Sequence, residues 1–188
     1  MIDKINGLTA FQTPSVVKRK ILEEIYFSLP SDPIIVEIGT QRHGARTSED
    51  GQSTRTLGRL VEKHGGAFWS VDNDEGAVRA ARADFEGAFF KCERGRDFLL
   101  SFPHPIDFLY LDGGDDPEEN LIEYEIALKT LAPGSVVLVD DCMTYGGRDY
   151  GKGDSIKRKY GLEISFHFGR YRVGTREGGA SAPPKALG

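Results

Sequence analysis

The fold is decided by the stretch P-I-I-V-E-I-G-T at residues 33–40 and by the later G-Q-S-T at residues 51–54. The short β-branched run at residues 34–36, bounded by proline and glycine, is typical of a buried parallel strand. Ser53 or Thr54 is a favourable N-cap for the helical pattern that follows. A strand, a glycine loop and a helix N-terminus thus follow one another. This order lets a nucleotide-like ligand approach bare backbone and unpaired N–H groups.

The next apolar run, residues 67–71, ends in an acid, Asp72. In doubly wound α/β folds an acid at the tip of the second strand binds the two hydroxyls of a ribose. A dinucleotide site would also need the glycine pattern G-x-G-x-x-G, and the second and third glycines are missing from this turn. A nicotinamide- or nucleotide-sugar-dependent enzyme on a related sheet is therefore an alternative rather than the favoured interpretation.

These motifs together resemble those of a known family. E-x-G-T at residues 37–40, G-x-S-T at residues 51–54 and V-D-N at residues 71–73 resemble class I S-adenosylmethionine-dependent methyltransferases, and the resemblance covers residues 33–176. It implies a Rossmann-like α/β fold, with a seven-stranded, mostly parallel sheet, a C-terminal antiparallel hairpin and helices on both faces. It also implies S-adenosylmethionine as the cofactor. The alternative within this resemblance is a module that binds the cofactor without catalysis.

The family resemblance assigns the cofactor contacts. The first glycine loop passes the methionine part of the cofactor, Asp72 holds the ribose, and residues 92–96 edge the adenine. Residues 41–50 are an insertion in that loop, compared with the usual tight turn of the family. The expected cofactor-binding residues are Glu37, Gly39, Thr40, Gly51, Ser53, Thr54, Asp72, Asn73, Arg94, Gly95, Arg96 and Asp112.

Apolar periodicity along the chain predicts an alternation of strands and helices. We expect one methyltransferase domain over residues 1–176, of which residues 1–30 form an N-terminal helical segment, and a disordered tail at residues 177–188. The expected helices span residues 14–29, 54–63, 74–85, 94–102, 117–131 and 155–160. The expected strands span residues 34–36, 67–71, 88–91, 106–111, 136–139, 162–168 and 171–175.

Acids follow four of the predicted parallel strands, and ligands in open α/β sheets bind beyond such strand ends. Asp112 follows the fourth strand, and Asp140 and Asp141 follow the fifth. Three converging carboxylates repel one another unless a cation lies among them, and hard oxygen ligands suit Mg²⁺. Asp112, Asp140 and Asp141 are thus candidate metal ligands. Alternatively, Asp112 is a turn residue and the aspartate pair caps the next segment.

The same three positions resemble the metal ligands of the catechol and caffeoyl-CoA type O-methyltransferases. This implies methylation of an oxygen atom on a small-molecule acceptor, with Asp112 and Asp141 in catalytic roles. Catechol-type enzymes use a lysine shortly after the strand-four acid as the base, whereas this sequence has G-G-D-D at residues 113–116. The candidate replacement bases are His43, in the inserted loop, and, less well placed, Tyr145, after the fifth strand. A metal-free N- or O-methyltransferase is the remaining alternative.

Composition limits the partners. The sequence has 188 residues, a net charge of −5 and 39% hydrophobic residues, which are values of an ordinary globular protein. The negative charge argues against a nucleic-acid partner, and the basic run at residues 157–159 is short. Cys92 and Cys142 lie far apart in the sequence and suit reduced thiols in a cytoplasmic protein. We expect no signal peptide or membrane partner, and a homodimer stays open.

Overall fold

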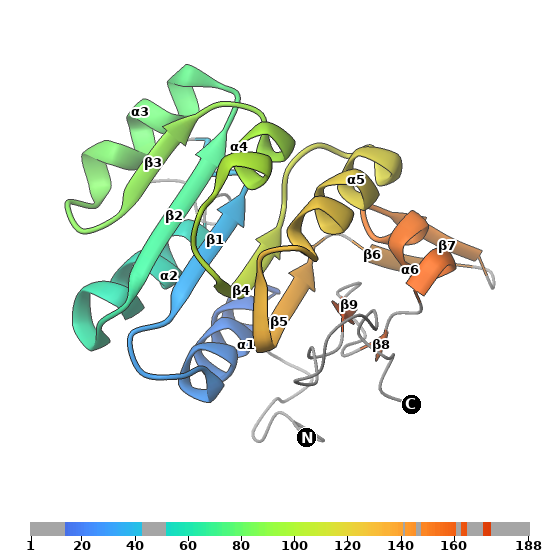
Figure 1. The fold of residues 1–188 in the computed structure, drawn as a ribbon, viewed down its shortest axis with the longest axis horizontal. Helices are drawn as coiled ribbons and strands as arrows, with labels where there is room; N and C mark the ends of the chain where they lie inside the picture. Colours follow the sequence, from blue (N-terminus) through green and yellow to red (C-terminus); the bar gives the residue numbers. More distant parts are fainter. Residues whose placement is uncertain are drawn as a thin grey trace.

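The computed structural model describes residues 14–42, 52–140, 142–145, 148–160, 163–164 and 171–173. Within these ranges it describes the side chains of residues 18–42, 53–140 and 151–160. Helices and parallel strands alternate along most of this chain, as the sequence predicts (Figure 1).

Five parallel strands form the centre of the molecule in the order β3-β2-β1-β4-β5. This order confirms the Rossmann-like α/β core. Because the strands are parallel, the carboxyl ends of β1, β2 and β4 meet at one edge of the sheet, where the chain also reverses its strand order. The five strands are β1 (Ile34–Ile38), β2 (Ala67–Asp72), β3 (Phe89–Cys92), β4 (Ile106–Leu111) and β5 (Leu131–Val139).

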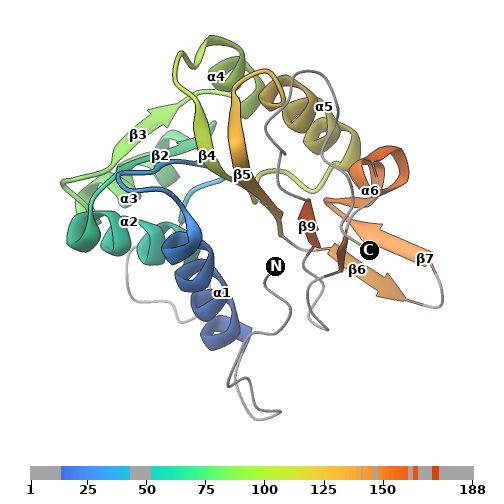
Figure 2. The same cartoon turned by 60° about the horizontal axis from the view of Figure 1, so that its bottom comes forward.

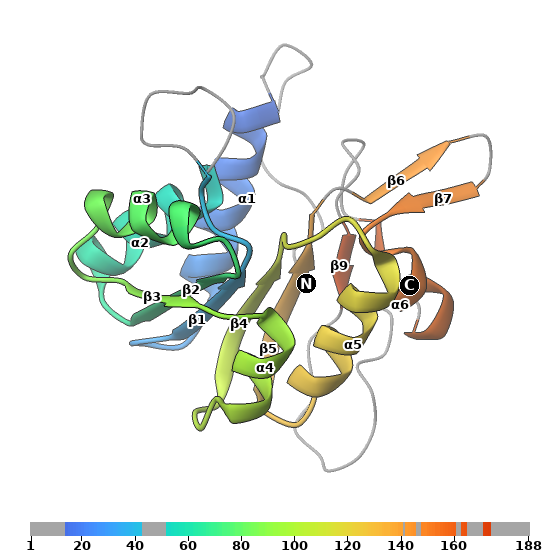
Figure 3. The ribbon, with the colours of Figure 1, turned by 90° about the horizontal axis from the view of Figure 1, so that it is seen from above.

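Helices cover both faces of the sheet (Figure 3). One face carries α1, α2 and α3, and the other carries α4 and α5, with α6 packed beside α5. The six helices are α1 (Pro14–Ser28), α2 (Gln52–His64), α3 (Glu75–Asp84), α4 (Gly95–Ser101), α5 (Pro117–Ala127) and α6 (Asp154–Tyr160). None of the helices in these described ranges is both long and apolar enough to cross a bilayer.

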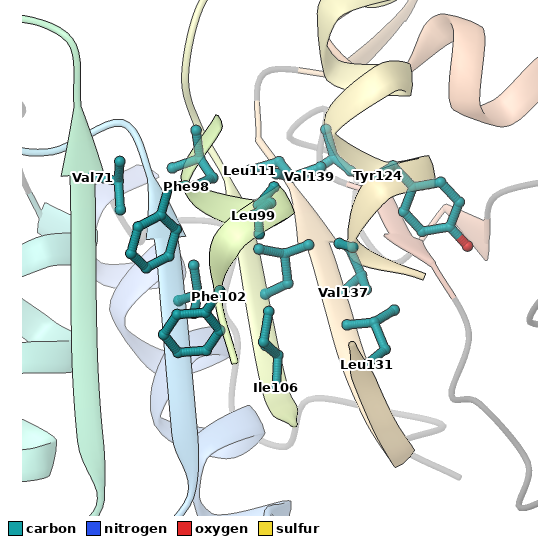
Figure 4. Packing of buried hydrophobic residues seen from close by; sticks show 14 of the residues in the cluster. Val71, Phe98, Leu99, Phe102, Ile106, Leu111, Tyr124, Leu131, Val137 and Val139 are labelled. Atoms are coloured by element: carbon teal, nitrogen blue, oxygen red, sulfur yellow. The ribbon is translucent and has the colours of Figure 1, made fainter. Parts of the chain in front are cut away.

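Side chains of the central strands alternate between the two faces, with the period of two that strand geometry imposes. On β4, Leu109 and Leu111 enter the cluster beneath α4 and α5, whereas Phe108 and Tyr110 enter the cluster beneath α1 and α2. The first cluster is shown in Figure 4. Burial on both faces explains why these strands are continuous apolar runs rather than alternating ones.

The boundary between α5 and β5 differs from the prediction. The sequence pattern predicted a helix to residue 131 and a strand from residue 136, but α5 ends at Ala127 and β5 begins at Leu131. Leu131 pairs with Ile106, and the register then shifts before Val136 pairs with Phe108. The proline and glycine at residues 133 and 134 lie in this irregularity instead of ending the helix.

Beyond β5 the chain adds short antiparallel strands. A two-stranded hairpin of β6 (Cys142–Tyr145) and β7 (Arg148–Gly151), which was not predicted, leads into α6 (Figure 2). β9 (Tyr171–Val173) pairs antiparallel with β5, and β8 (Glu163–Ile164) pairs with β9. Most of the predicted terminal hairpin lies outside the described residues, so the complete seven-stranded sheet stays a prediction.

Candidate functional site

A cleft of about 680 Å³ opens where β1, β2 and β4 end. Strand β1 supplies a glycine loop, β2 supplies an acid, and the N-terminus of α4 closes one side. Most of the residues predicted to bind the cofactor line this cleft. They are Gly39, Thr40, Ser53, Asp72, Asn73, Arg94, Gly95, Arg96 and Asp112.

Gly39 brings the ends of β1 and β4 together at the bottom of the cleft. Its φ is +93°, a conformation that favours glycine, and a Cβ there would collide with the backbone carbonyl of Asp112. The Gly39 amide donates a hydrogen bond of 2.7 Å to the Val71 carbonyl, and the Asp112 amide donates one of 2.8 Å to Ile38. The glycine therefore permits the backbones of β1 and β4 to approach each other closely at the bottom of the cleft.

Asp72 ties the tip of β2 to the glycine loop. One carboxylate oxygen accepts a 3.0 Å hydrogen bond from the Thr40 amide, and the other accepts a 2.9 Å bond from the Asp74 amide. Each carboxylate oxygen can accept two hydrogen bonds, so both retain capacity for ligand hydroxyls. Asp72 thus holds a fixed orientation at the rim of the cleft with accepting capacity to spare.

Glu37 and Thr54 do not line the cleft. Glu37 is fully buried, and its Oε2 accepts hydrogen bonds from Thr54 Oγ1 at 2.7 Å and from Ser70 Oγ at 2.6 Å. Its Oε1 has no hydrogen-bond partner among the described residues. Burial raises the pKa of Glu37 to about 7, although the hydroxyl donors act against this shift. Through these hydrogen bonds, Glu37 on β1 connects to Ser70 on β2 and to Thr54 near the start of α2, and it lies in the core rather than in the cleft.

Gly95 begins α4 against a buried acid of α5. A Cβ on Gly95 would collide with Glu123 Oε1 and with the side chain of Ile38. Burial raises the pKa of Glu123 to about 7, and the negative charge of Glu119 adds to the effect. Gly95 and Glu123 both line the cleft and form a cradle between α4 and α5, which lie this close together only because position 95 lacks a side chain.

Two lysines meet the acids at the ends of β4 and β5. Lys18 Nζ lies 2.5 Å from Asp140 Oδ2 and 3.2 Å from Asp112 Oδ2. Lys152 Nζ lies 2.8 Å from Asp112 Oδ1, and the Tyr110 hydroxyl donates a 2.5 Å hydrogen bond to Asp140 Oδ2. Burial raises the pKa of Asp112, while the ammonium group of Lys18 acts in the opposite direction. Asp112 and Asp140 thus each have a lysine ammonium group within ion-pair distance.

The remaining site predictions have different outcomes. His43, Gly51 and Asp141 lie outside the described residues, so the predicted base and the complete three-aspartate metal site stay predictions. No three Asp, Glu, His or Cys side chains gather as a possible metal site in the part of the chain that the structure describes.

Sequence reasoning missed Lys18, Lys152 and Glu123. A signal for Glu123 existed, because it shares the inward face of α5 with Asn120, Tyr124 and Ala127 at helical spacing.

Comparison with known protein families identifies the family to which the chain belongs. Residues 36–142, more than half of the chain, match the family model described as a methyltransferase domain. The chain belongs to this methyltransferase domain family. It has the fold of the class I S-adenosylmethionine-dependent methyltransferases, with the cleft at the strand ends that this fold uses for ligands. Comparison with curated proteins finds no match.

Solved structures similar to this methyltransferase domain share its fold at low identity. An O-methyltransferase from Bacillus cereus, in complex with SAH (S-adenosylhomocysteine), has 22% identity and a TM-score of 0.53 over 71% of this chain and 60% of that one. The O-methyltransferase NovP has 18% identity and a TM-score of 0.60 over 87% of this chain and 79% of that one.

An rRNA methylase from Streptococcus thermophilus has 15% identity and a TM-score of 0.56 over 87% of this chain and 96% of that one. The methyltransferase domain described here spans about 60% of the length of the Bacillus cereus enzyme and 59% of the O-methyltransferase TomG from Streptomyces achromogenes.

Proposed function

We propose that this chain transfers the methyl group of S-adenosylmethionine to an oxygen atom of a small-molecule acceptor. The observation that carries the proposal is the cleft at the ends of β1, β2 and β4, with Asp72 held at its rim. The family match supports methyl transfer, and structural neighbours described as O-methyltransferases favour oxygen. The acceptor and its atom are the part of the proposal that needs experiment.

The residues of the cleft suit this cofactor. Asp72 would accept hydrogen bonds from the two ribose hydroxyls, for which its carboxylate oxygens retain capacity. The backbone at Gly95 would leave room for the adenine, which would lie beside the carboxyl of Glu123. Gly39 and Asp112 would lie beside the methionine end, because they meet where β1 and β4 finish.

The chain contributes to the reaction mainly by holding its reactants in line. When bound, S-adenosylmethionine supplies a methyl group on a sulfonium, which the acceptor oxygen attacks as the carbon–sulfur bond breaks and sulfur keeps the electron pair. Fixing two reactants in such a geometry can supply roughly 7 to 11 kcal/mol of the barrier. The proton of the acceptor hydroxyl must also leave, and His43 is our proposed base for it.

Electrostatics favour a small acceptor over RNA, even though one structural neighbour is described as an rRNA methylase. The net charge is −5. On α6, Lys159 pairs with Glu125, and Arg158 lies 3.3 Å from Glu118 and 3.5 Å from Asp154. These basic side chains face acids of this chain, which weakens their attraction for a phosphate backbone.

We also propose that β8 and β9 belong to a complete seven-stranded sheet within one domain of residues 1–176. The support is the antiparallel pairing of β9 with β5 and of β8 with β9. This is the arrangement that the family resemblance implies for the end of the chain.

Calorimetric titration with S-adenosylhomocysteine tests the function. We expect micromolar binding by the wild-type chain and no binding of NAD⁺. Asp72→Asn should weaken binding by about 10- to 100-fold, because hydrogen bonds to a charged group are worth about 1.5–3 kcal/mol. Glu86→Gln, an exposed acid outside the cleft, should bind like the wild type. Equal affinities of the wild type and Asp72→Asn would contradict the ribose assignment, and the absence of any binding would overturn the function.

A radiolabelled methyl-transfer assay then tests the acceptor class. Phenols and catechols represent the small oxygen acceptors, and a structured rRNA fragment represents the alternative. Transfer to a phenolic oxygen supports the proposal, whereas transfer to RNA alone would overturn the acceptor class while leaving the cofactor assignment in place.

A further inference from the structure

Two positive charges already meet the acids at the ends of β4 and β5. Lys18, on α1, bridges Asp112 and Asp140, and Lys152, in the turn before α6, binds the other oxygen of Asp112. The Tyr110 hydroxyl binds the same Asp140 oxygen as Lys18. Two carboxylates, which the sequence suggested as metal ligands, are thus bound by side chains that come from distant parts of the chain.

These groups are buried, which makes the pairing energetically important. The side chains of Lys152, Asp140 and Lys18 are 4%, 3% and 12% exposed, respectively. Lysine is almost never this buried unless it is paired, because an isolated ammonium group loses its hydration. A lysine whose carboxylate was taken by another cation would lose its nearest buried counter-charge, which is destabilising.

A divalent ion therefore does not fit Asp112 and Asp140 as they are arranged. It would bring two positive charges to oxygen atoms that lie 2.5 to 3.2 Å from ammonium groups. Coulomb repulsion at such short distances is large in a partly desolvated site. Both lysines would have to leave before a metal could coordinate these oxygens.

We propose that Lys18 and Lys152 replace the divalent ion at this site, so that the chain works as a metal-independent methyltransferase. The inference rests on the proposed methyltransferase function. The two ammonium groups neutralise the acids where β4 and β5 end, as a divalent ion would, but they cannot bind an acceptor oxygen and a carboxylate by coordination. The acceptor is then oriented by hydrogen bonds and shape rather than by chelation.

The lysines also position the backbone of the cleft. Lys152 Nζ lies 3.3 Å from the Asp112 carbonyl oxygen, which is the group that Gly39 approaches from β1. Lys18 connects α1, which packs on α2 and on one face of the sheet, to the ends of β4 and β5. Lys152 is thus a positioning residue for the floor of the cleft, and Lys18 is one for the N-terminal helix α1.

Electron paramagnetic resonance of Mn²⁺ tests the proposal independently of turnover. The full wild-type chain, with and without S-adenosylhomocysteine, should leave Mn²⁺ free up to about 1 mM, the weak end of affinities for oxygen-ligand sites. The double variant Lys18→Met/Lys152→Met should gain Mn²⁺ binding, because its carboxylates lose their cations. Lys63→Met, an exposed lysine at the end of α2, should behave like the wild type.

The opposite pattern would overturn the inference. Micromolar Mn²⁺ binding by the wild type that is lost in Asp112→Asn would mean that a metal displaces the lysines. If the double variant does not fold, the Mn²⁺ titration of the wild type still tests the proposal by itself. Methyl transfer by the wild type should also be unchanged by a chelator, and its loss with recovery on adding Mg²⁺ would contradict the proposal.

Calorimetry with S-adenosylhomocysteine separates this inference from the function. Cofactor binding without Mn²⁺ binding supports both. Cofactor binding together with tight Mn²⁺ binding overturns only the lysine proposal, and the absence of cofactor binding overturns the methyltransferase function on which the lysine proposal rests.

Discussion

Gly95 is the residue at which one added methyl group should close part of the cleft. Gly95→Ala would place a Cβ against Glu123 Oε1 and Ile38, so the cradle between α4 and α5 would have to shift. We expect affinity for S-adenosylhomocysteine to fall by about tenfold, because Gly95 and Glu123, which would have to move apart, both line the cleft. Calorimetry of the purified variant measures this change.

The matched control is Gly87→Ala, which lies outside the cleft and where a Cβ would only make ordinary contact with Glu62. It should bind S-adenosylhomocysteine as the wild type does. An unchanged affinity in Gly95→Ala, with the fold intact by circular dichroism, would show that the ligand does not use this cradle.

Individual side chains show what a sequence pattern can and cannot predict about a site. The place of Asp72 in the cleft was predicted from its position at the end of a strand, because the ends of parallel strands converge at one edge of the sheet. The position of Glu37 was not, since whether an acid at a strand end faces the ligand or the core depends on the hydroxyls of Thr54 and Ser70 around it. Lys18 gave no signal at all, as its partners are 94 and 122 residues away.

The contact of α5 with α6 contains a buried hydroxyl that should be dispensable. The rings of Tyr124 and Tyr160 meet edge to face, with centroids 5.2 Å apart, but the Tyr124 hydroxyl has no hydrogen-bond partner among the described residues. A buried hydroxyl without a partner costs about 1–3 kcal/mol. Tyr124→Phe should therefore be neutral or stabilise the chain by up to about 1 kcal/mol in urea unfolding.

Tyr110→Phe is the contrasting change, because its hydroxyl donates a 2.5 Å hydrogen bond to Asp140. It should destabilise the chain by about 1–3 kcal/mol, as expected when a buried charged acceptor loses a donor. A larger loss of stability in Tyr124→Phe than in Tyr110→Phe would contradict the hydrogen bonding assigned to the two tyrosine hydroxyls.

Whole elements were more predictable than their ends. The runs that became β1, β2 and β4 are apolar because both of their faces are buried, so the core strands follow from composition alone. The predicted end of α5 was wrong because Leu128 and Leu131 continue the apolar helical pattern, whereas the pairing of Leu131 with Ile106 favours a strand from Leu131 onward. Tertiary pairing of this kind leaves no local trace in the sequence.

At the scale of the molecule, the five-stranded core was predicted because strand and helix alternation allows few topologies. The lysines that meet the acids, Lys18 and Lys152, were not predicted. Their positions depend on contacts between distant segments of the chain rather than on periodicity. The parallel core, which matches the family, thus carries the least information about the acceptor.

Two buried carboxyls should make the stability of the whole molecule depend on pH near neutrality. Glu37 and Glu123 have pKa values raised from 4.5 to about 7 by burial. The folded chain therefore binds protons that the unfolded chain has released, and the free energy of unfolding must fall as pH rises from about 4.5 through about 7. Each group should contribute about 1–3 kcal/mol to this fall.

Urea unfolding at pH values between about 5.5 and 8 measures the slope of stability against pH. Glu123→Gln should flatten it, because the amide keeps the shape of the protonated carboxyl and does not titrate. Glu125→Gln is the control: the pKa of Glu125 is lowered by its hydrogen bond with Lys159, so its contribution is lost only at acid pH and the slope near neutrality should stay as in the wild type. A stability that rises with pH across this window, or an equal slope in Glu123→Gln, would mean that these carboxyls are ionised in the fold and that the cradle beside Gly95 carries a negative charge.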